Sequence, residues 1–229
     1  MKVLFNAGKR CRMVLILQAL MGLALPAAPV QANLLNFDAN ACSYSGNGAG
    51  DLVSCTSYGF INQSYGDSAE VDVRYVDLLN PASSLRWWGG NYNNLYGVVW
   101  GGNGDAAGQS WNQIQILPTA GQAVSLHGFN LGAYPNMQRT TNVRILDGAA
   151  STLLLDLGSL LVGTGDVATA VQTQIISANG VTIEWRDTAY NVGIDDIDFS
   201  VVPVPLPAAA WLFLSGLAGL LALQRQRSH

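Results

Sequence analysis

The sequence predicts an all-β protein, a jelly-roll-like antiparallel β-sandwich preceded by a cleavable signal peptide and followed by a single transmembrane helix. Apolar and polar residues alternate with a period of two, which puts one face of each strand in a core and the other in water. Clusters of Gly, Asn and Asp separate these runs, and no long stretch carries the apolar face of a helix. The strictest alternation falls at residues 70–75, 113–116, 182–186 and 196–201.

Weaker alternation at 124–131 and 142–146 extends the set, so we expect roughly eight to eleven short strands in one sandwich. Asn179-Gly180 lies between the apolar runs 171–177 and 181–187. An Asn-Gly pair in that position is typical of a β-hairpin turn, so these two runs are predicted to pair with each other.

Residues 1–32 have the three parts of a signal peptide. Four basic residues precede an apolar stretch at 13–25, and Val30-Gln31-Ala32 offers small residues for cleavage before Asn33. The alternative is an uncleaved N-terminal anchor. The short apolar stretch and the helix-breaking Pro26 and Pro29 favour cleavage.

Residues 203–229 form a separate C-terminal unit. Pro203, Pro205 and Pro207 make a hinge, and residues 206–223 carry no charge, close to the shortest run that spans a bilayer as a helix. Arg225 and Arg227 follow, as expected of a tail held on the cytoplasmic side. The segment between the two apolar stretches is therefore predicted to lie outside the cytoplasm.

This tail resembles the PEP-CTERM sorting domain of Gram-negative bacteria, in which a Pro-x-Pro element, a transmembrane helix and a basic end follow in order. The matching parts are Pro205-Leu206-Pro207, the run containing 210–213, and Arg225 with Arg227. The glutamate of the family motif is replaced by Leu206. The resemblance implies recognition by an exosortase-like sorting enzyme, transient anchoring, and release or display at the cell surface. An ordinary single-pass anchor is the alternative.

The remaining residues, 33–202, are long enough for one domain with a sizeable core. All 15 acidic residues of the chain lie there against five arginines, a net charge of about −10, and there is no lysine. Such a surface repels nucleic acid and anionic lipid and favours cations or neutral partners, so nucleic-acid binding by this domain is not expected. Cys42 and Cys55 are its only cysteines, and in an exported domain they are predicted to form a disulfide.

Residues 65–73, 100–102 and 191–200 are similar to the exported body of many PEP-CTERM proteins. The last of these segments is also similar to the final strand of galactose-binding-like and carbohydrate-binding jelly rolls. That resemblance implies a structural calcium held by Asp38 with Asp195, Asp196 and Asp198. Calcium prefers carboxylate and carbonyl oxygens, and three aspartates in four positions repel one another unless solvated or neutralised. A solvated acidic edge strand is the alternative.

Catalytic motifs are not found. His127 is the single histidine of the domain, there is no Gly-x-Ser-x-Gly elbow, and nothing selects one pair of carboxylates. We therefore expect no enzymatic activity. The Gly-rich stretches lack the strand-to-helix context of phosphate-binding loops and are interpreted as turns.

Aromatic residues in an Asn- and Gly-rich segment are the remaining functional signal. Trp87, Trp88, Tyr92 and Tyr96 offer flat faces for sugar rings beside amides for hydroxyl groups. Neighbours on a strand point to opposite faces, so at most one of the two adjacent tryptophans is expected in the core. Three further tryptophans lie in or beside strand runs and are predicted to be core residues: Trp100, Trp111 and Trp185.

Two functions follow from these patterns. The first is an exported, non-enzymatic surface or extracellular-matrix protein, sorted through its tail and associated with exopolysaccharide. The alternative is a carbohydrate-binding module of the galactose-binding-like type that uses the Trp87 to Tyr96 surface.

Overall fold

The computed structural model describes residues 31–38, 40–105, 110–149, 152–186 and 191–204, together with Gly216 and Gln224. The predicted signal peptide, except its last two residues, lies outside the described residues. So does most of the predicted sorting tail, including Pro205, Pro207, Arg225 and Arg227. In the part that is described, no helix is both long and apolar enough to cross a membrane.

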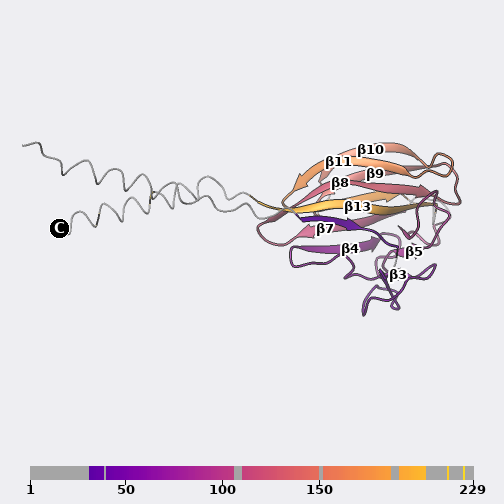
Figure 1. Ribbon diagram of the computed structural model, residues 1–229, viewed down its shortest axis with the longest axis horizontal. Coiled ribbons are helices and arrows are strands. Elements are labelled where there is room, and N and C mark those ends of the chain that lie inside the picture. The colour runs from indigo at the N-terminus through magenta and orange to yellow at the C-terminus, as the bar shows by residue number, and fades with distance from the viewer. Residues whose placement is uncertain are drawn as a thin grey trace, which may run out of the picture.

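Within the described residues, thirteen strands form two antiparallel sheets that stack as a sandwich (Figure 1). The first sheet runs in the order β11 (Thr169–Ser177), β8 (Gln122–Ala133), β13 (Val192–Pro203), β6 (Val98–Trp100), β5 (Arg86–Trp88), β3 (Phe60–Ile61) and β2 (Cys42–Ser43), with β1 (Gln31–Leu35) also paired to β13. The second runs β10 (Leu153–Val162), β9 (Arg139–Asp147), β12 (Val181–Arg186), β7 (Trp111–Pro118) and β4 (Val71–Asp77).

The prediction of an antiparallel β-sandwich is confirmed. From β7 onward most consecutive strands alternate between the two sheets, which is compatible with the jelly-roll form of the sandwich. The alternating runs in the sequence correspond to β4, β7, β12 and β13, and the weaker runs to β8 and β9.

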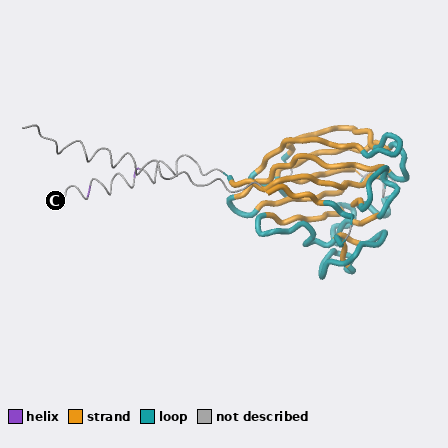
Figure 2. Tube along the Cα trace, in the orientation of Figure 1, coloured by secondary structure: helices purple, strands orange, loops and turns teal. Residues whose placement is uncertain are grey.

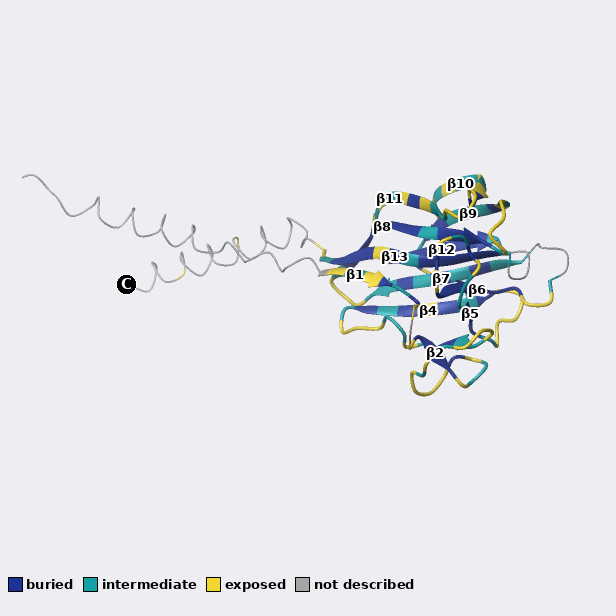
Figure 3. Ribbon diagram, turned by 45° about the vertical axis from the view of Figure 1, so that its right-hand side comes forward, coloured by how far each residue is buried: buried dark blue, intermediate teal, exposed yellow. Residues whose placement is uncertain are grey.

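The core fills the space between the sheets. In β7, Ile114 and Ile116 are buried while Gln113 and Gln115 lie on the other face, and β12 buries Ile183 and Trp185. Figure 3 shows β8 and β12 mostly in the colour of buried residues. Trp100 and Trp185 are fully buried, as predicted. Removing this much aromatic and branched apolar surface from water is the main force that holds the two sheets together.

The predicted hairpin at Asn179-Gly180 is wrong. β11 pairs with β8 in the first sheet, whereas β12 pairs with β7 and β9 in the second, so the turn carries the chain from one sheet to the other. Gly180 has a φ of 89°, and a Cβ there would lie 2.3 Å from the carbonyl oxygen of Ile116. The turn chemistry was recognised correctly, but turn chemistry does not determine which strands then pair.

The first and last strands lie side by side. β1 pairs antiparallel with β13, with Gln31 opposite Val201, and the amide of Val204 donates a hydrogen bond to the carbonyl of Gly121 at 2.9 Å. Figure 2 traces the beginning of β1 and the end of β13 to the same end of the sandwich. Backbone hydrogen bonds therefore hold the chain from β1 through Val204. This span contains the main core between the sheets and a smaller buried cluster of Tyr92, Leu95 and Val98.

The predicted disulfide is confirmed. Cys42 and Cys55 are bonded with a Cα–Cα distance of 5.0 Å. The bond closes the segment between β2 and β3, where two strands of two residues each supply little pairing of their own. A covalent link in this position limits the freedom of that loop when the chain unfolds.

Candidate functional site

Asp195 is a buried carboxyl group on β13. It is 2% exposed, and its Oδ1 accepts hydrogen bonds from the amides of Asp196 at 2.8 Å and Phe37 at 3.3 Å. Burial raises the pKa of Asp195 to about 8, the negative charge of Asp196 adds to this, and that of Asp38 contributes least. The expected approach of the Asp38 segment to Asp195 is thus present, through its neighbour Phe37.

The four aspartates of the predicted calcium site do not form one close cluster. A register shift separates Asp195 from Asp198, and Asp196 has a φ of 50° and accepts a hydrogen bond from Asn130 Nδ2 at 3.0 Å. Asp198 is exposed. Among the described residues, no three His, Cys, Asp or Glu side chains gather closely enough to hold a metal ion. Calcium binding at Asp38 and Asp195 stays a prediction.

The predicted aromatic surface is wrong as a single platform. Trp87 is 4% exposed with its Nε1 donating to the carbonyl of Phe37 at 2.6 Å, and Tyr92 is fully buried. Neither ring has a face to offer a sugar. Trp88 is half-buried and Tyr96 is exposed. The expectation that at most one of the adjacent tryptophans is a core residue is confirmed.

The two accessible rings lie on opposite sides of β5. Tyr96 meets the buried Trp87 edge-on at 6.0 Å, whereas Trp88 packs edge-on against Tyr58 at 4.8 Å and Tyr134 at 5.8 Å. Nearby amide groups are also engaged. Asn93 Oδ1 accepts from the backbone amide of Ala133, and Asn93 Nδ2 donates to the carbonyl of Gly165. Asn94 Oδ1 accepts from the backbone amide of Ala168. These side chains hold the loop rather than remaining available for a ligand.

A different set of polar side chains lines up across the outer face of the second sheet. Strand register places Gln113 of β7 opposite Glu184 of β12, Glu184 opposite Arg144 of β9, and Arg144 opposite Asp156 of β10. Trp111 lies two residues before Gln113 and therefore on the same face. We call the six residues Trp111, Gln113, Gln115, Arg144, Glu184 and Arg186 the polar face.

Hydrogen bonds fix the side chains of the polar face in place. Gln115 Nε2 donates to Gln113 Oε1 at 3.0 Å, and Gln113 Nε2 donates to Glu184 Oε1 at 2.7 Å. The other carboxylate oxygen of Glu184 accepts from Arg144 Nε in a salt bridge. Glu184 is only 3% exposed, so the pairing compensates a buried charge.

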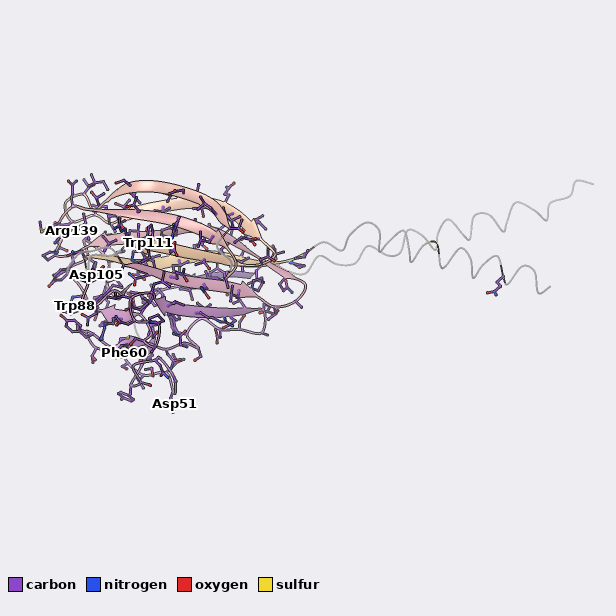
Figure 4. The ribbon with its side chains drawn as sticks, turned by 180° about the vertical axis from the view of Figure 1, so that it is seen from behind. Asp51, Phe60, Trp88, Asp105, Trp111 and Arg139 are labelled. Atoms are coloured by element: carbon purple, nitrogen blue, oxygen red, sulfur yellow. A yellow bond between two sulfur atoms is a disulfide. The ribbon has the colours of Figure 1, made fainter. Side chains whose placement is uncertain are left out.

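Trp111 belongs to this face and not to the core, contrary to the prediction. Its ring is partly exposed, with the Arg144 guanidinium 4.3 Å and the Arg186 guanidinium 6.0 Å from its centroid. Cation–π contacts of this kind hold an arginine flat against an indole. Trp88 lies on β5 of the first sheet and Trp111 on β7 of the second, and Figure 4 labels both.

A pocket of about 420 Å³ opens beside the row of polar residues. Its polar lining is Gln113, Arg144, Asp156 and Glu184, and its apolar lining is Leu146, Ala149 and Leu153. The volume falls in the range of small-molecule sites. Polar groups along one side and aliphatic carbon along the other suit a ligand with both hydroxyl groups and C–H faces.

On the outer face of the second sheet, positive and negative side chains are balanced, whereas the rest of the domain is strongly acidic. Three of the five arginines of the exported domain, Arg74, Arg144 and Arg186, lie on the outer face of the second sheet. Arg74 pairs with Asp72 at 2.7 Å, and Arg144 pairs with Glu184. The excess negative charge of the domain therefore lies elsewhere.

A sequence signal for the polar face existed. The alternating runs at 113–116 and 182–186 were interpreted only as strands with one wet side. Their wet positions hold Gln, Glu and Arg, long side chains that carry several hydrogen-bonding atoms.

Comparisons with known proteins leave the family open. No protein-family model matches the chain, and no curated protein matches it. The Podospora anserina GH26-CBM35 β-(1,4)-mannanase is 16% identical over 61% of this chain and 29% of its own, with a TM-score of 0.33. The Arthrobacter globiformis T6 isomalto-dextranase, solved with panose, is 11% identical over 76% of this chain and 33% of its own, with a TM-score of 0.31.

The chain thus spans about a third or less of the length of either enzyme. At these TM-scores neither likeness assigns a fold family or a function to it.

Proposed function

We propose that this protein is an exported, non-enzymatic protein of the cell surface or extracellular matrix that binds polysaccharide through the polar face of its second sheet. The observation that carries the proposal is the row Gln113, Glu184 and Arg144, hydrogen-bonded in register beside Trp111 and the pocket. This surface replaces the Trp87 to Tyr96 segment as the carbohydrate-binding site.

The chemistry of the polar face matches a glycan. Neighbouring strands lie about 4.8 Å apart, so the row presents amide and guanidinium groups at regular intervals along a line. Gln113 and Gln115 each keep one amide hydrogen beyond those used in the hydrogen bonds of the row, and the Arg144 side chain is 40% exposed. Because the network already orders these side chains, a ligand meets them without a large further loss of rotamer entropy.

The proposed location rests on the two ends of the chain. The signal peptide at 1–32 sends the domain across the inner membrane, and the PEP-CTERM-like tail at 203–229 hands it to an exosortase-like enzyme. The confirmed Cys42–Cys55 disulfide supports an oxidising compartment.

We also propose that a calcium ion binds at Asp195 and Asp38, with carbonyl oxygens and water completing its ligands. The geometric support is the hydrogen bond from the amide of Phe37, the neighbour of Asp38, to the buried Asp195 carboxyl group. Burial and the charges of Asp196 and Asp38 also raise the pKa of Asp195, a situation that a bound cation relieves. Chelation is then expected to lower the melting temperature at pH 8, and an unchanged value contradicts the site.

Affinity electrophoresis of residues 31–204 through gels containing matrix polysaccharide tests the glycan site. Trp111→Ala and Gln113→Ala are each expected to weaken retention about tenfold, the equivalent of about 1.4 kcal/mol. Trp88→Ala and Tyr96→Ala are the matched controls and keep the retention of the wild type. If the control variants lose retention while Trp111→Ala keeps it, the proposed site is overturned. If the wild type itself is not retained, the proposed function is overturned.

A further inference from the structure

Asn-Gly pairs occur three times in the chain, at Asn47-Gly48, Asn103-Gly104 and Asn179-Gly180. In such a pair the backbone nitrogen of the glycine can attack the side-chain amide of the asparagine, because glycine has no side chain to block the approach. The two groups must first leave any hydrogen bonds that hold them and then rotate toward each other. The fold therefore decides which of the three pairs reacts.

Hydrogen bonds hold the first pair in place. Asn47 Oδ1 accepts from the hydroxyl group of Ser45 at 2.6 Å and from the backbone amide of Ala49 at 3.0 Å. The amide of Gly48, which contains the attacking nitrogen, donates to the carbonyl of Ser45 at 2.9 Å. Gly48 is also buried, and a Cβ placed there would lie 2.4 Å from the carbonyl oxygen of Ile61, so the backbone has little room to turn.

The third pair is held in a similar way. Asn179 Nδ2 donates to Asp147 Oδ2 at 2.8 Å. The amide of Gly180 donates to the carbonyl of Ser177 at 3.3 Å, and Gly180 is buried in the turn between β11 and β12. Attack at this pair therefore requires both hydrogen bonds to break first.

The middle pair has none of these restraints. Asn103 and Gly104 are both exposed, and the next residue, Asp105, is labelled in Figure 4. Within the described parts of the chain, no hydrogen bond holds the side chain of Asn103 or the amide of Gly104. The carbonyl of Asn103 alone accepts from Asn80 Nδ2, at 3.5 Å. Gly104 has a φ of 98°, and no atom lies within 4 Å of the position that a Cβ would occupy. Both reacting groups are thus free to rotate.

We propose that Asn103 is a site of spontaneous deamidation, whereas Asn47 and Asn179 keep their side-chain amides in the folded protein. Hydroxide removes the proton from the Gly104 amide, and the nitrogen forms a bond to Cγ of Asn103. The bond from Cγ to the side-chain nitrogen breaks, and that nitrogen takes up a proton from water and leaves as ammonia. Water then adds to one of the two carbonyl carbons of the resulting succinimide ring and breaks its bond to the ring nitrogen. The products are aspartate or isoaspartate, with one water consumed and one ammonia released.

Isoaspartate at position 103 alters the loop, because its main chain runs through the side-chain carbon and is one methylene longer. The amide of Asp105 closes a turn onto the carbonyl of Gly102 at 3.0 Å, and the amide of Gly102 donates to Asp77 Oδ2 at 3.1 Å. Asp77 is 2% exposed, so its carboxylate depends on such amides for compensation of its buried charge. The isoaspartate form is expected to melt about 2–4 °C below the fresh protein, the shift that corresponds to about one lost hydrogen bond.

Peptide mapping by mass spectrometry, after incubation of the folded protein at mildly alkaline pH, tests the site. Asn103 is expected to deamidate about tenfold or more faster than Asn47 or Asn179, because each of those must first break two or more hydrogen bonds. The matched control is the same protein in concentrated urea. There the three pairs are expected to react at similar rates, since the fold no longer holds any of them.

Asn103→Gln links the chemistry to the stability of the loop. Glutamine would have to close a six-membered ring, which is slower, so this variant is expected to keep its melting temperature during an incubation in which that of the wild type falls.

Similar rates at the three pairs in the folded protein overturn the proposal, and so does a slower reaction at Asn103 than at Asn47 or Asn179. A folded protein in which Asn103 does not react, although it reacts in urea, overturns it as well. None of these outcomes depends on glycan binding, because Asn103 is not part of the polar face.

Discussion

The free energy of unfolding of the wild type is expected to decrease as the pH rises, because Asp195 is buried, and replacing Asp195 by asparagine is expected to abolish this decrease. The Asp195 carboxyl is buried, and its pKa in the folded protein is about 8, against an ordinary value of 3.8. Between these values the folded state holds a proton that the unfolded chain has released. The contribution of Asp195 to the free energy of unfolding is therefore largest below about pH 4, the ordinary pKa, and decreases as the pH rises to about 8, the pKa in the folded protein.

The magnitude follows from the size of the shift. A displacement of about four pH units corresponds to at most about 6 kcal/mol, since each unit contributes about 1.4 kcal/mol. Asparagine keeps an oxygen that accepts from the amides of Phe37 and Asp196 but does not ionise. In the variant, this part of the pH dependence is expected to vanish.

Thermal unfolding of residues 31–204 in the presence of a chelator, at a series of pH values from 4 to 8, measures the difference between wild type and Asp195→Asn. Asp198→Asn, an exposed aspartate on the same strand, is the control and should follow the wild type. Parallel curves for wild type and Asp195→Asn would refute the reasoning. Added calcium at pH 8 is expected to stabilise the wild type and not Asp195→Asn.

Three further predictions test other parts of the structure. Trp87→Ala removes a buried side chain and its hydrogen bond to Phe37 and should lower the free energy of unfolding by about 3–5 kcal/mol in urea titrations, whereas Trp88→Ala costs much less. Replacing Cys42 and Cys55 by alanine should cost about 3 kcal/mol in the same assay, and no change would mean that the loop is already ordered without the bond. The C-terminus of the processed protein, read by mass spectrometry, should lie after Val204, because the fold holds the chain that far, and an intact Arg227 on the released protein contradicts sorting.

The alternation of apolar and polar residues was sufficient to predict the sandwich and most of its long strands. It depends on local chemistry alone, since a strand with one dry face shows that face in its own sequence. The same pattern carries no information about partners. The turn at Asn179-Gly180 has the residues of a hairpin, yet β11 and β12 belong to different sheets because each finds its partner far away in the chain.

The candidate site depended on such distant pairing and was therefore missed. Gln113, Glu184 and Arg144 meet only because three strands align in one register, and alternation fixes the face of a residue without fixing its neighbour on the next strand. Trp87 illustrates the reverse error. Its segment resembles an exposed loop, but the indole packs in the core and donates a hydrogen bond to the carbonyl of Phe37, 50 residues earlier.

The central claim is that the glycan binds at the polar face of the second sheet, and the indole N–H signals of the tryptophans test it most directly. Residues 31–204 contain five tryptophans, whose signals can be assigned one at a time with Trp→Phe variants. On addition of oligosaccharides cut from the matrix polysaccharide, the Trp111 signal is expected to move while that of Trp88 stays in place. Movement of Trp88 with a stationary Trp111 would contradict the account.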